Sequence, residues 1–204
     1  MSGAVHEALY TTEVILRNAI DLRIGDWNVS QTDPSTGRSR SIDWLLDPAN
    51  LLVRLIRRDT LDEAIRRARQ AGAPHGRALR HCDVLTQLGF STWRFLLPDR
   101  DPGRQLLWRQ ALVNAFPHLR VPPPQLVAEV DGIYKLRNKC AHMESLLDSR
   151  NIRRQYQNMR SVLQAISPAA DQWFTSTQRV TAALRDRPQP SAIHHVGDAG
   201  GSNG

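Results

Sequence analysis

The sequence predicts an all-α protein, a helical bundle with short accessory helices. Apolar residues recur at helical spacing in the longer segments, as in 5–24, where Val5, Leu9, Leu16 and Ile20 share one side. No extended stretch alternates apolar and polar residues as a half-buried strand does. Prolines and glycines divide the chain into segments of helix length.

The elements that follow the first helix can be placed by the proline, glycine and N-cap residues that bound them. They are a turn-rich loop over 25–42, a short helix at 43–46, and helices over 50–58, 62–70, 76–97 (broken near Gly89), 102–116, 125–137, 151–166 and from 168 onward. Asp47 and Asp101 each precede a proline, which is typical of an N-cap followed by proline at the first helical position. We expect one domain over 1–186 and a disordered tail over 187–204, which is rich in proline and glycine.

Composition limits the class of protein. The chain has 204 residues and 41% apolar content, enough for a core. No run reaches the roughly 18 apolar residues of a membrane span, and the N-terminus lacks the apolar core of a signal peptide, so a cytoplasmic location without membrane contact is expected. Two cysteines, Cys82 and Cys140, make no disulfide framework. The net charge of +7 indicates an anionic partner.

Two groups of side chains have both a structural and a functional interpretation. Arginines 57, 58, 66, 67 and 69 form either a solvated face or a track for an RNA backbone, with Arg66 and Arg67 as the candidates. The apolar set Trp93, Phe95, Leu96, Trp108, Leu112 and Phe116 could stack bases, but its helical spacing favours the core.

A metal site is not favoured. His81, Cys82 and Asp83 could be combined with Cys140 and His142 as zinc ligands, but closely paired ligands such as C-x2-C are missing. The joint near 71–74 contains proline and the helix after it is apolar, unlike a DNA-recognition helix.

The stretch 136–142, Leu-Arg-Asn-Lys-Cys-Ala-His, gathers groups suited to phosphate chemistry. Arg137 can clamp phosphate oxygens, and His142 can transfer protons near neutral pH. On an ideal helix Asn138 and His142 share a face, whereas Arg137 and His142 are about 140° apart. For both to act on one phosphate, the helix must end near Cys140 or a second copy of the chain must complete the site.

These residues carry a family resemblance. Arg-Asn-x-x-Ala-His at 137–142 resembles the R-x4-6-H signature of HEPN-fold ribonucleases, and the wider chain resembles the Abi-like branch of that superfamily, which is associated with bacterial phage defence. Further similar stretches occur in the same order, at 13–18 (EVILRN), 88–95 (LGFSTWRF), 107–108 (LW) and 115–117 (AFP). The resemblance runs from the first helix to Leu147. One departure follows the histidine, where the family often has His-Glu-Pro and this chain has Met-Glu-Ser.

The resemblance implies a HEPN-like bundle and a metal-independent endoribonuclease that leaves 2′,3′-cyclic phosphate ends. His142 would be the acid or base, Arg137 would stabilise charge on the phosphate, and Asn138 would hold the histidine or the phosphate. It also implies a homodimer with a composite site and single-stranded RNA or transfer RNA as substrate. No cofactor or metal is expected. A role in phage defence or as a toxin, with an antitoxin or defence partner, is a further expectation.

Supporting roles are expected for a few other charged residues. Glu13 either forms an ion pair with Arg17 on its own helix or faces inward and orients a cleft arginine, Arg17 or Arg137. Glu144 is a further supporting candidate, and Lys135 and Lys139 are candidates for RNA-backbone contacts.

Three other interpretations remain open. The basic residues near His142 are also what a helix C-terminus favours. The same scaffold could be a non-catalytic module that binds RNA or a protein. A transcription regulator that uses the basic helices would instead bind duplex DNA.

Overall fold

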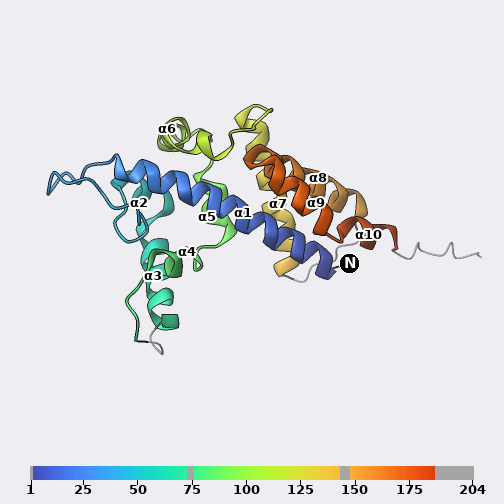
Figure 1. Cartoon of the computed structure of the whole chain (residues 1–204), viewed down its shortest axis with the longest axis horizontal. Helices are drawn as coiled ribbons and strands as arrows, with labels where there is room; N and C mark the ends of the chain where they lie inside the picture. The colour runs from blue at the N-terminus through green and yellow to red at the C-terminus, as the bar shows by residue number, and fades with distance from the viewer. Residues whose placement is uncertain (1, 73–75, 143–147, 187–204) are drawn as a thin grey trace, which may run out of the picture.

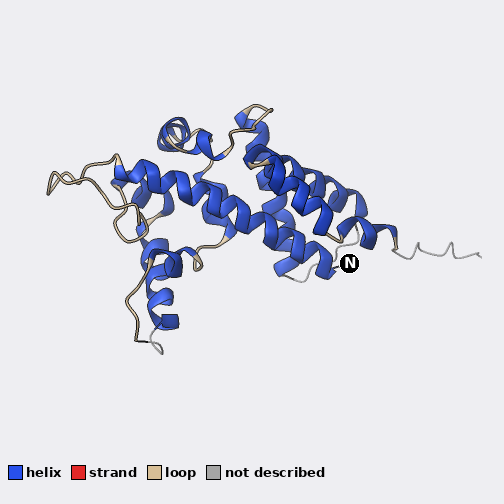
Figure 2. Cartoon of the chain, viewed as in Figure 1, coloured by secondary structure: helices blue, strands red, loops and turns tan. Residues whose placement is uncertain are grey.

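The computed structural model describes residues 2–72, 76–142 and 148–186, and within them it confirms the all-α prediction (Figure 2). The elements are α1 (Ser2–Val29), α2 (Asn50–Ile56), α3 (Arg58–Gly72), α4 (His81–Leu85), α5 (Phe90–Leu96), α6 (Pro102–Gln110), the 3-10 helix η2 (Leu112–Ala115), α7 (Pro123–Ala141), α8 (Ser149–Ile166), α9 (Pro168–Thr177) and α10 (Val180–Arg185). Over these ranges the only strand-like pairing is an isolated bridge between Thr32 and Ser39. None of the helices that the structure describes combines the length and hydropathy that a membrane crossing requires.

Helix α1 is the element on which the others assemble (Figure 1). Its N-terminal part lies at the end of the molecule that holds α7, α8 and α10, and its C-terminal part reaches the other end, where α2 is drawn. It contacts α5, α7, α8, α10 and η2. The contacts bury one side of the helix along its whole length, from Val5 through Leu16 to Trp27.

The loop predicted over 25–42 begins later, at Ser30, because α1 continues through Gly25. A Cβ on Gly25 would lie 3.1 Å from the carbonyl oxygen of Ile42, so glycine lets the returning chain approach the helix closely. Trp27 and Asn28 are then buried on the same helix, at 7% and 0% exposure. Tertiary packing therefore extends the helix beyond the residue that the sequence pattern marks as its end.

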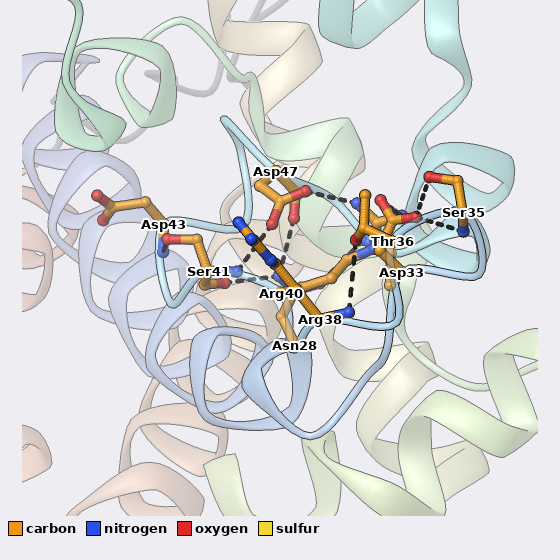
Figure 3. Close-up of polar contacts among 10 residues, drawn as sticks. Asn28, Asp33, Ser35, Thr36, Arg38, Arg40, Ser41, Asp43 and Asp47 are labelled. Atoms are coloured by element: carbon orange, nitrogen blue, oxygen red, sulfur yellow. Dashed lines mark hydrogen bonds and ion pairs between the residues drawn. The ribbon is translucent and has the colours of Figure 1, made fainter.

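Asn28 anchors the loop (Figure 3). Its Nδ2 donates to the carbonyl oxygens of Ser41 (2.6 Å) and Asp47 (2.9 Å), and its Oδ1 accepts from the N–H of Ala49 (2.9 Å). One buried amide thus satisfies three backbone groups that no regular structure would satisfy.

Asp47 does not cap a helix, contrary to the prediction. Its carboxylate accepts from Arg40 and from the N–H of Ser41, and Arg40 also pairs with Asp33 (Figure 3). The short helix predicted at 43–46 is a turn, closed by a bond from the N–H of Leu46 to the carbonyl of Asp43. The acid is used within the loop, so α2 starts without a side-chain cap.

Two other predicted boundaries are confirmed, and two predicted helices are each split into two elements. The break near Gly89 is confirmed, since Gly89 is the N-cap of α5, and Asp101 caps α6 by accepting from two backbone N–H groups. The segment predicted over 102–116 is divided into α6 and η2, and the last predicted helix into α9 and α10.

The core confirms most of the predicted packing. Trp93, Trp108 and Phe116 are buried, but Phe95 is 42% exposed and was wrongly assigned to it. The guanidinium groups of Arg94 and Arg104 instead lie over its ring, with their Cζ atoms 5.0 and 5.8 Å from the ring centroid, in cation–π contacts.

Candidate functional site at the end of helix α7

Helix α7 carries the signature residues on a firmly packed element. Pro123 starts the helix, where a missing N–H costs nothing. A buried stripe of Leu126, Val130, Ile133, Leu136 and Cys140 faces the core at helical spacing. Burial raises the pKa of the Cys140 thiol, so this cysteine is an inert core group at neutral pH.

The helix continues through Ala141, and His142 is its C-cap. The φ and ψ of His142 are −88° and 11°, so its ψ has left the helical range, although its N–H still donates to the carbonyl of Asn138 at 3.0 Å. Because this i→i−4 hydrogen bond is kept, the position of His142 on the helix stays about 140° around the axis from that of Arg137. The end of the helix does not bring the two groups together within one chain.

Arg137 faces α1, where it meets Glu13. Its Nε lies 3.8 Å from Oε2 of Glu13, an ion pair too long for a hydrogen bond. The Glu13 side chain is only 17% exposed, against 41% for Arg137. Burial raises the pKa of Glu13, and the charges of Arg137 and Arg17 counteract this only in part.

Of the two partners considered for Glu13, the structure favours Arg137. Arg17 donates from Nε to Asn18 at 3.2 Å and takes part in no ion pair among the described residues. Glu13 faces inward, as one of the two interpretations required, and touches the arginine of the signature across two helices.

The remaining signature groups have no side-chain partners among the residues that the structure describes. Asn138 is half-buried and His142 is exposed. Over the described ranges, no hydrogen bond or ion pair joins the side chains of Arg137, Asn138 and His142 to one another. Glu144 lies outside the residues that the structure describes.

The two lysines of α7 lie on a different side of the helix from Arg137. Nζ of Lys135 lies 2.8 Å from Asp131, which also accepts from Arg94 at 2.9 Å. The hydrogen bond from Lys135, together with Arg94, holds the pKa of Asp131 below its usual value. Lys139 is exposed and has no partner within the described part of the chain.

Arg66 and Arg67 are not brought to this cluster. They lie on α3, which extends from the opposite end of the molecule (Figure 1). Arg66 holds Glu63 through two hydrogen bonds of 2.8 and 2.6 Å, and Arg67 lies 3.5 Å from the same carboxylate. Glu63 therefore compensates part of their charge locally.

The ligands of the zinc site considered above are also separated. Nε2 of His81 lies 2.8 Å from Asp21, which accepts at the same oxygen from Trp44. Asp83 pairs with Arg77 and Arg80. Among the described residues, no group of three or more histidine, cysteine or acidic side chains is placed to hold a metal.

One feature could not be found from the signature. A groove of about 730 Å³ lies between α7 and α8, lined by Lys135 and Lys139 on one side and by Asn151, Gln155 and Asn158 on the other. The signal in the sequence is the amide spacing i, i+4 and i+7 on α8, opposite Gly132 on α7.

Comparisons with protein-family models, with curated proteins and with solved structures gave no match.

Proposed function

We propose that this chain is a metal-independent endoribonuclease of HEPN type, acting on single-stranded RNA or transfer RNA. The observation that carries the proposal is the end of α7. There Arg137 is half-exposed, its one ion pair with a described residue is the 3.8 Å contact with Glu13, and an exposed His142 follows at the helix cap. An arginine in that state keeps its hydrogen-bond donors for a ligand.

The reaction uses the nucleophile that RNA itself supplies. The 2′-oxygen attacks the adjacent phosphorus, the bond to the 5′-oxygen breaks, and the products are a 2′,3′-cyclic phosphate and a 5′-hydroxyl. His142 takes the proton of the 2′-hydroxyl or gives one to the leaving oxygen, a contribution of about 10²–10⁴-fold. Arg137 stabilises the charge that develops on the phosphoryl oxygens.

Two further residues support this assignment. Asn138 shares the His142 face of α7 and is half-buried, which suits an amide that orients the ring or donates to the phosphate. Glu13 is a positioning residue, because its carboxylate holds the guanidinium of Arg137 from α1.

A homodimer answers the separation of Arg137 and His142 on one helix. In a two-fold assembly the arginine of one copy can face the histidine of the other, so that each phosphate meets a complete pair. Lys139, which is exposed and lies on another side of α7, adds a positive charge near His142. A role in phage defence or as a toxin belongs to this proposal.

The second candidate is a non-catalytic module that binds RNA or a protein. It is favoured by the same separation, since a single chain offers a phosphate-binding arginine without an adjacent proton donor.

The test is an RNA-cleavage assay with EDTA present, on transfer RNA and on unstructured RNA. It compares the wild type with Arg137→Ala and His142→Ala, with Arg153→Ala as a control that removes an exposed arginine elsewhere. Cleavage by the wild type and the control, with cyclic-phosphate ends, supports the ribonuclease. Intact RNA in every lane with binding retained supports the module instead.

Mixing the two inactive variants tests the composite site. If Arg137 and His142 act across the dimer, randomly mixed dimers recover about a quarter of wild-type activity, because half are mixed and each has one intact site. If both residues act from one chain, each mixed dimer has no intact site and activity stays absent.

A further inference from the structure

The groove between α7 and α8 has a floor of linked amides. Gln155, which is 4% exposed, donates from Nε2 to Oδ1 of Asn151 at 3.1 Å and accepts at Oε1 from Nδ2 of Asn158 at 2.8 Å. Over the described residues, these bonds leave the Nδ2 group of Asn151 and the Oδ1 of Asn158 without partners. The row therefore ends in a free donor at one end and a free acceptor at the other.

Gly132 makes room for this floor. A Cβ at Gly132 would lie 2.3 Å from Oε1 of Gln155 and 3.2 Å from Nδ2 of Asn158. Because the position has no side chain, the amides of α8 lie against the backbone of α7. The groove is thus polar at its base, unlike the apolar grooves that receive amphipathic helices.

The charges around the groove are unequally satisfied. Lys135 and Arg94 share the carboxylate of Asp131, and the Asp148 carboxylate accepts from the N–H of Asn151 as the cap of α8. Arg154 donates to Oδ1 of Asn151 and meets no carboxylate within the described ranges. Lys139 likewise has no acidic partner there.

These charges give the groove a direction. Helices α7 and α8 lie side by side, so Lys139, in the last turn of α7, belongs to the end near the signature. Arg154 reaches toward that end by donating to Asn151 in the first turn of α8. Glu129 lies at the other end, beyond Gly132. Its Oε1 accepts from Gln125, and its Oε2 is buried without a partner in the described structure.

We infer that this groove binds one nucleotide of a single-stranded RNA. The phosphate lies between Lys139 and Arg154, and the base lies over the amides with its donor groups toward Asn158. Asparagine and glutamine read base edges because each offers a donor and an acceptor in one plane. The assignment rests on the proposed ribonuclease activity, to which it adds a subsite next to the signature.

The test compares two faces of α8. Arg154→Ala and Asn158→Ala change the groove, whereas Arg153→Ala and Gln157→Ala remove an arginine and a side-chain amide from the face toward α10. All four are made in a His142→Ala parent. Binding of a fluorescein-labelled RNA of about ten nucleotides is followed by fluorescence anisotropy.

The groove variants are expected to raise Kd about tenfold each, and the matched controls to stay within about twofold. Arg154→Ala should also lower the slope of log K against log salt by about 0.7, one phosphate contact. Thermal melting and sedimentation confirm that each variant is folded and keeps the parent's oligomeric state.

Several results would overturn the inference. If all four variants bind like the parent, the RNA lies elsewhere. If the groove variants change the oligomeric state, the face is an interface between copies. The outcome for the proposed function is read separately, in the wild-type background. Groove variants that cleave normally leave the ribonuclease standing without this subsite, whereas groove-dependent binding without wild-type cleavage removes the activity and keeps the site.

Discussion

The loop over 30–47 and the end of α7 are both rich in polar side chains, and they use them differently. In the loop, Arg40 lies between two carboxylates and Asn28 satisfies three backbone groups (Figure 3). At the end of α7, Arg137 has one distant partner, and His142 has none among the described residues.

The difference distinguishes polar side chains that stabilise the fold from polar side chains that are available to bind a ligand. A polar group whose bonds are completed inside the chain stabilises the fold and has little left for a ligand. A polar group held in place with its donors unused is available for one. Charge density in the sequence cannot distinguish these cases, because completion depends on contacts between distant residues.

The largest expected effect is on catalysis, from Arg137→Ala. RNA cleavage should fall about 10²–10³-fold, because one charge-stabilising group is removed. The free energy of unfolding should fall by less than about 1 kcal/mol, since the side chain is 41% exposed and its ion pair is long. Initial cleavage rates and urea denaturation measure the two quantities. A large loss of stability with unchanged cleavage would show that Arg137 stabilises the fold and does not act on RNA.

The next effect is on stability, from Asn28→Ala. Removing the buried amide leaves three backbone groups unsatisfied and should cost about 3 kcal/mol, lowering Tm by roughly 10 °C. Asn18→Ala is the matched control, an exposed asparagine on the same helix. Cleavage per folded molecule should not change. Equal melting of the two variants would contradict the anchoring role of Asn28.

A smaller effect is the pH dependence of Glu13→Gln. Because burial raises the pKa of Glu13 above its unfolded value near 4.5, protonation favours the folded state. The stabilisation by the protonated acid is complete below the unfolded pKa and is lost as pH rises through the folded pKa. The wild type should therefore gain stability relative to Glu13→Gln as pH falls from 7 to 4, measured by urea denaturation at each pH.

Glu63 supplies the control of opposite sign. Hydrogen bonding to Arg66 holds the pKa of Glu63 below its usual value, so its contribution is lost as pH falls. A difference between wild type and Glu13→Gln that is independent of pH would show that Glu13 is not buried as described.

The smallest effect is expected at α3. Arg66→Ala should leave RNA affinity within about twofold, because its guanidinium is already held by Glu63. Lys139→Ala should instead lower the salt slope by about 0.7. A tenfold loss of RNA affinity in Arg66→Ala would place α3 in the RNA-binding surface and show that a locally paired arginine can still bind RNA.

The sequence predicted the parts of the fold that local chemistry determines. Asp101 before Pro102 predicted the start of α6, Gly89 predicted the break before α5, and helical spacing predicted α7. It placed the end of α1 too early, because the close approach of Ile42 to Gly25 is a tertiary contact. It assigned Asp47 to a cap, because nothing local shows that Arg40 and Ser41 hold that carboxylate.

The candidate site divides in the same way. The signature residues could be named from their residue types and from the resemblance, and the 140° between Arg137 and His142 follows from helix geometry. The pairing of Arg137 with Glu13 could only be posed as one of two alternatives, since it joins α7 to α1. The groove depends on Gly132 facing Gln155 across two helices, and no local pattern reveals that register.

Helix α1 also limits how short a fragment of this chain can be and still fold. Its 28 residues extend roughly 42 Å, and the same helix contributes Leu9 and Leu16 to the core and Asn28 to the loop. A fragment that begins at α7 would lose the surface on which α7, α8 and α10 rest, together with the carboxylate that faces Arg137. Grafting α7 into another protein without α1 would therefore transfer the signature sequence but not the position of Arg137 against Glu13.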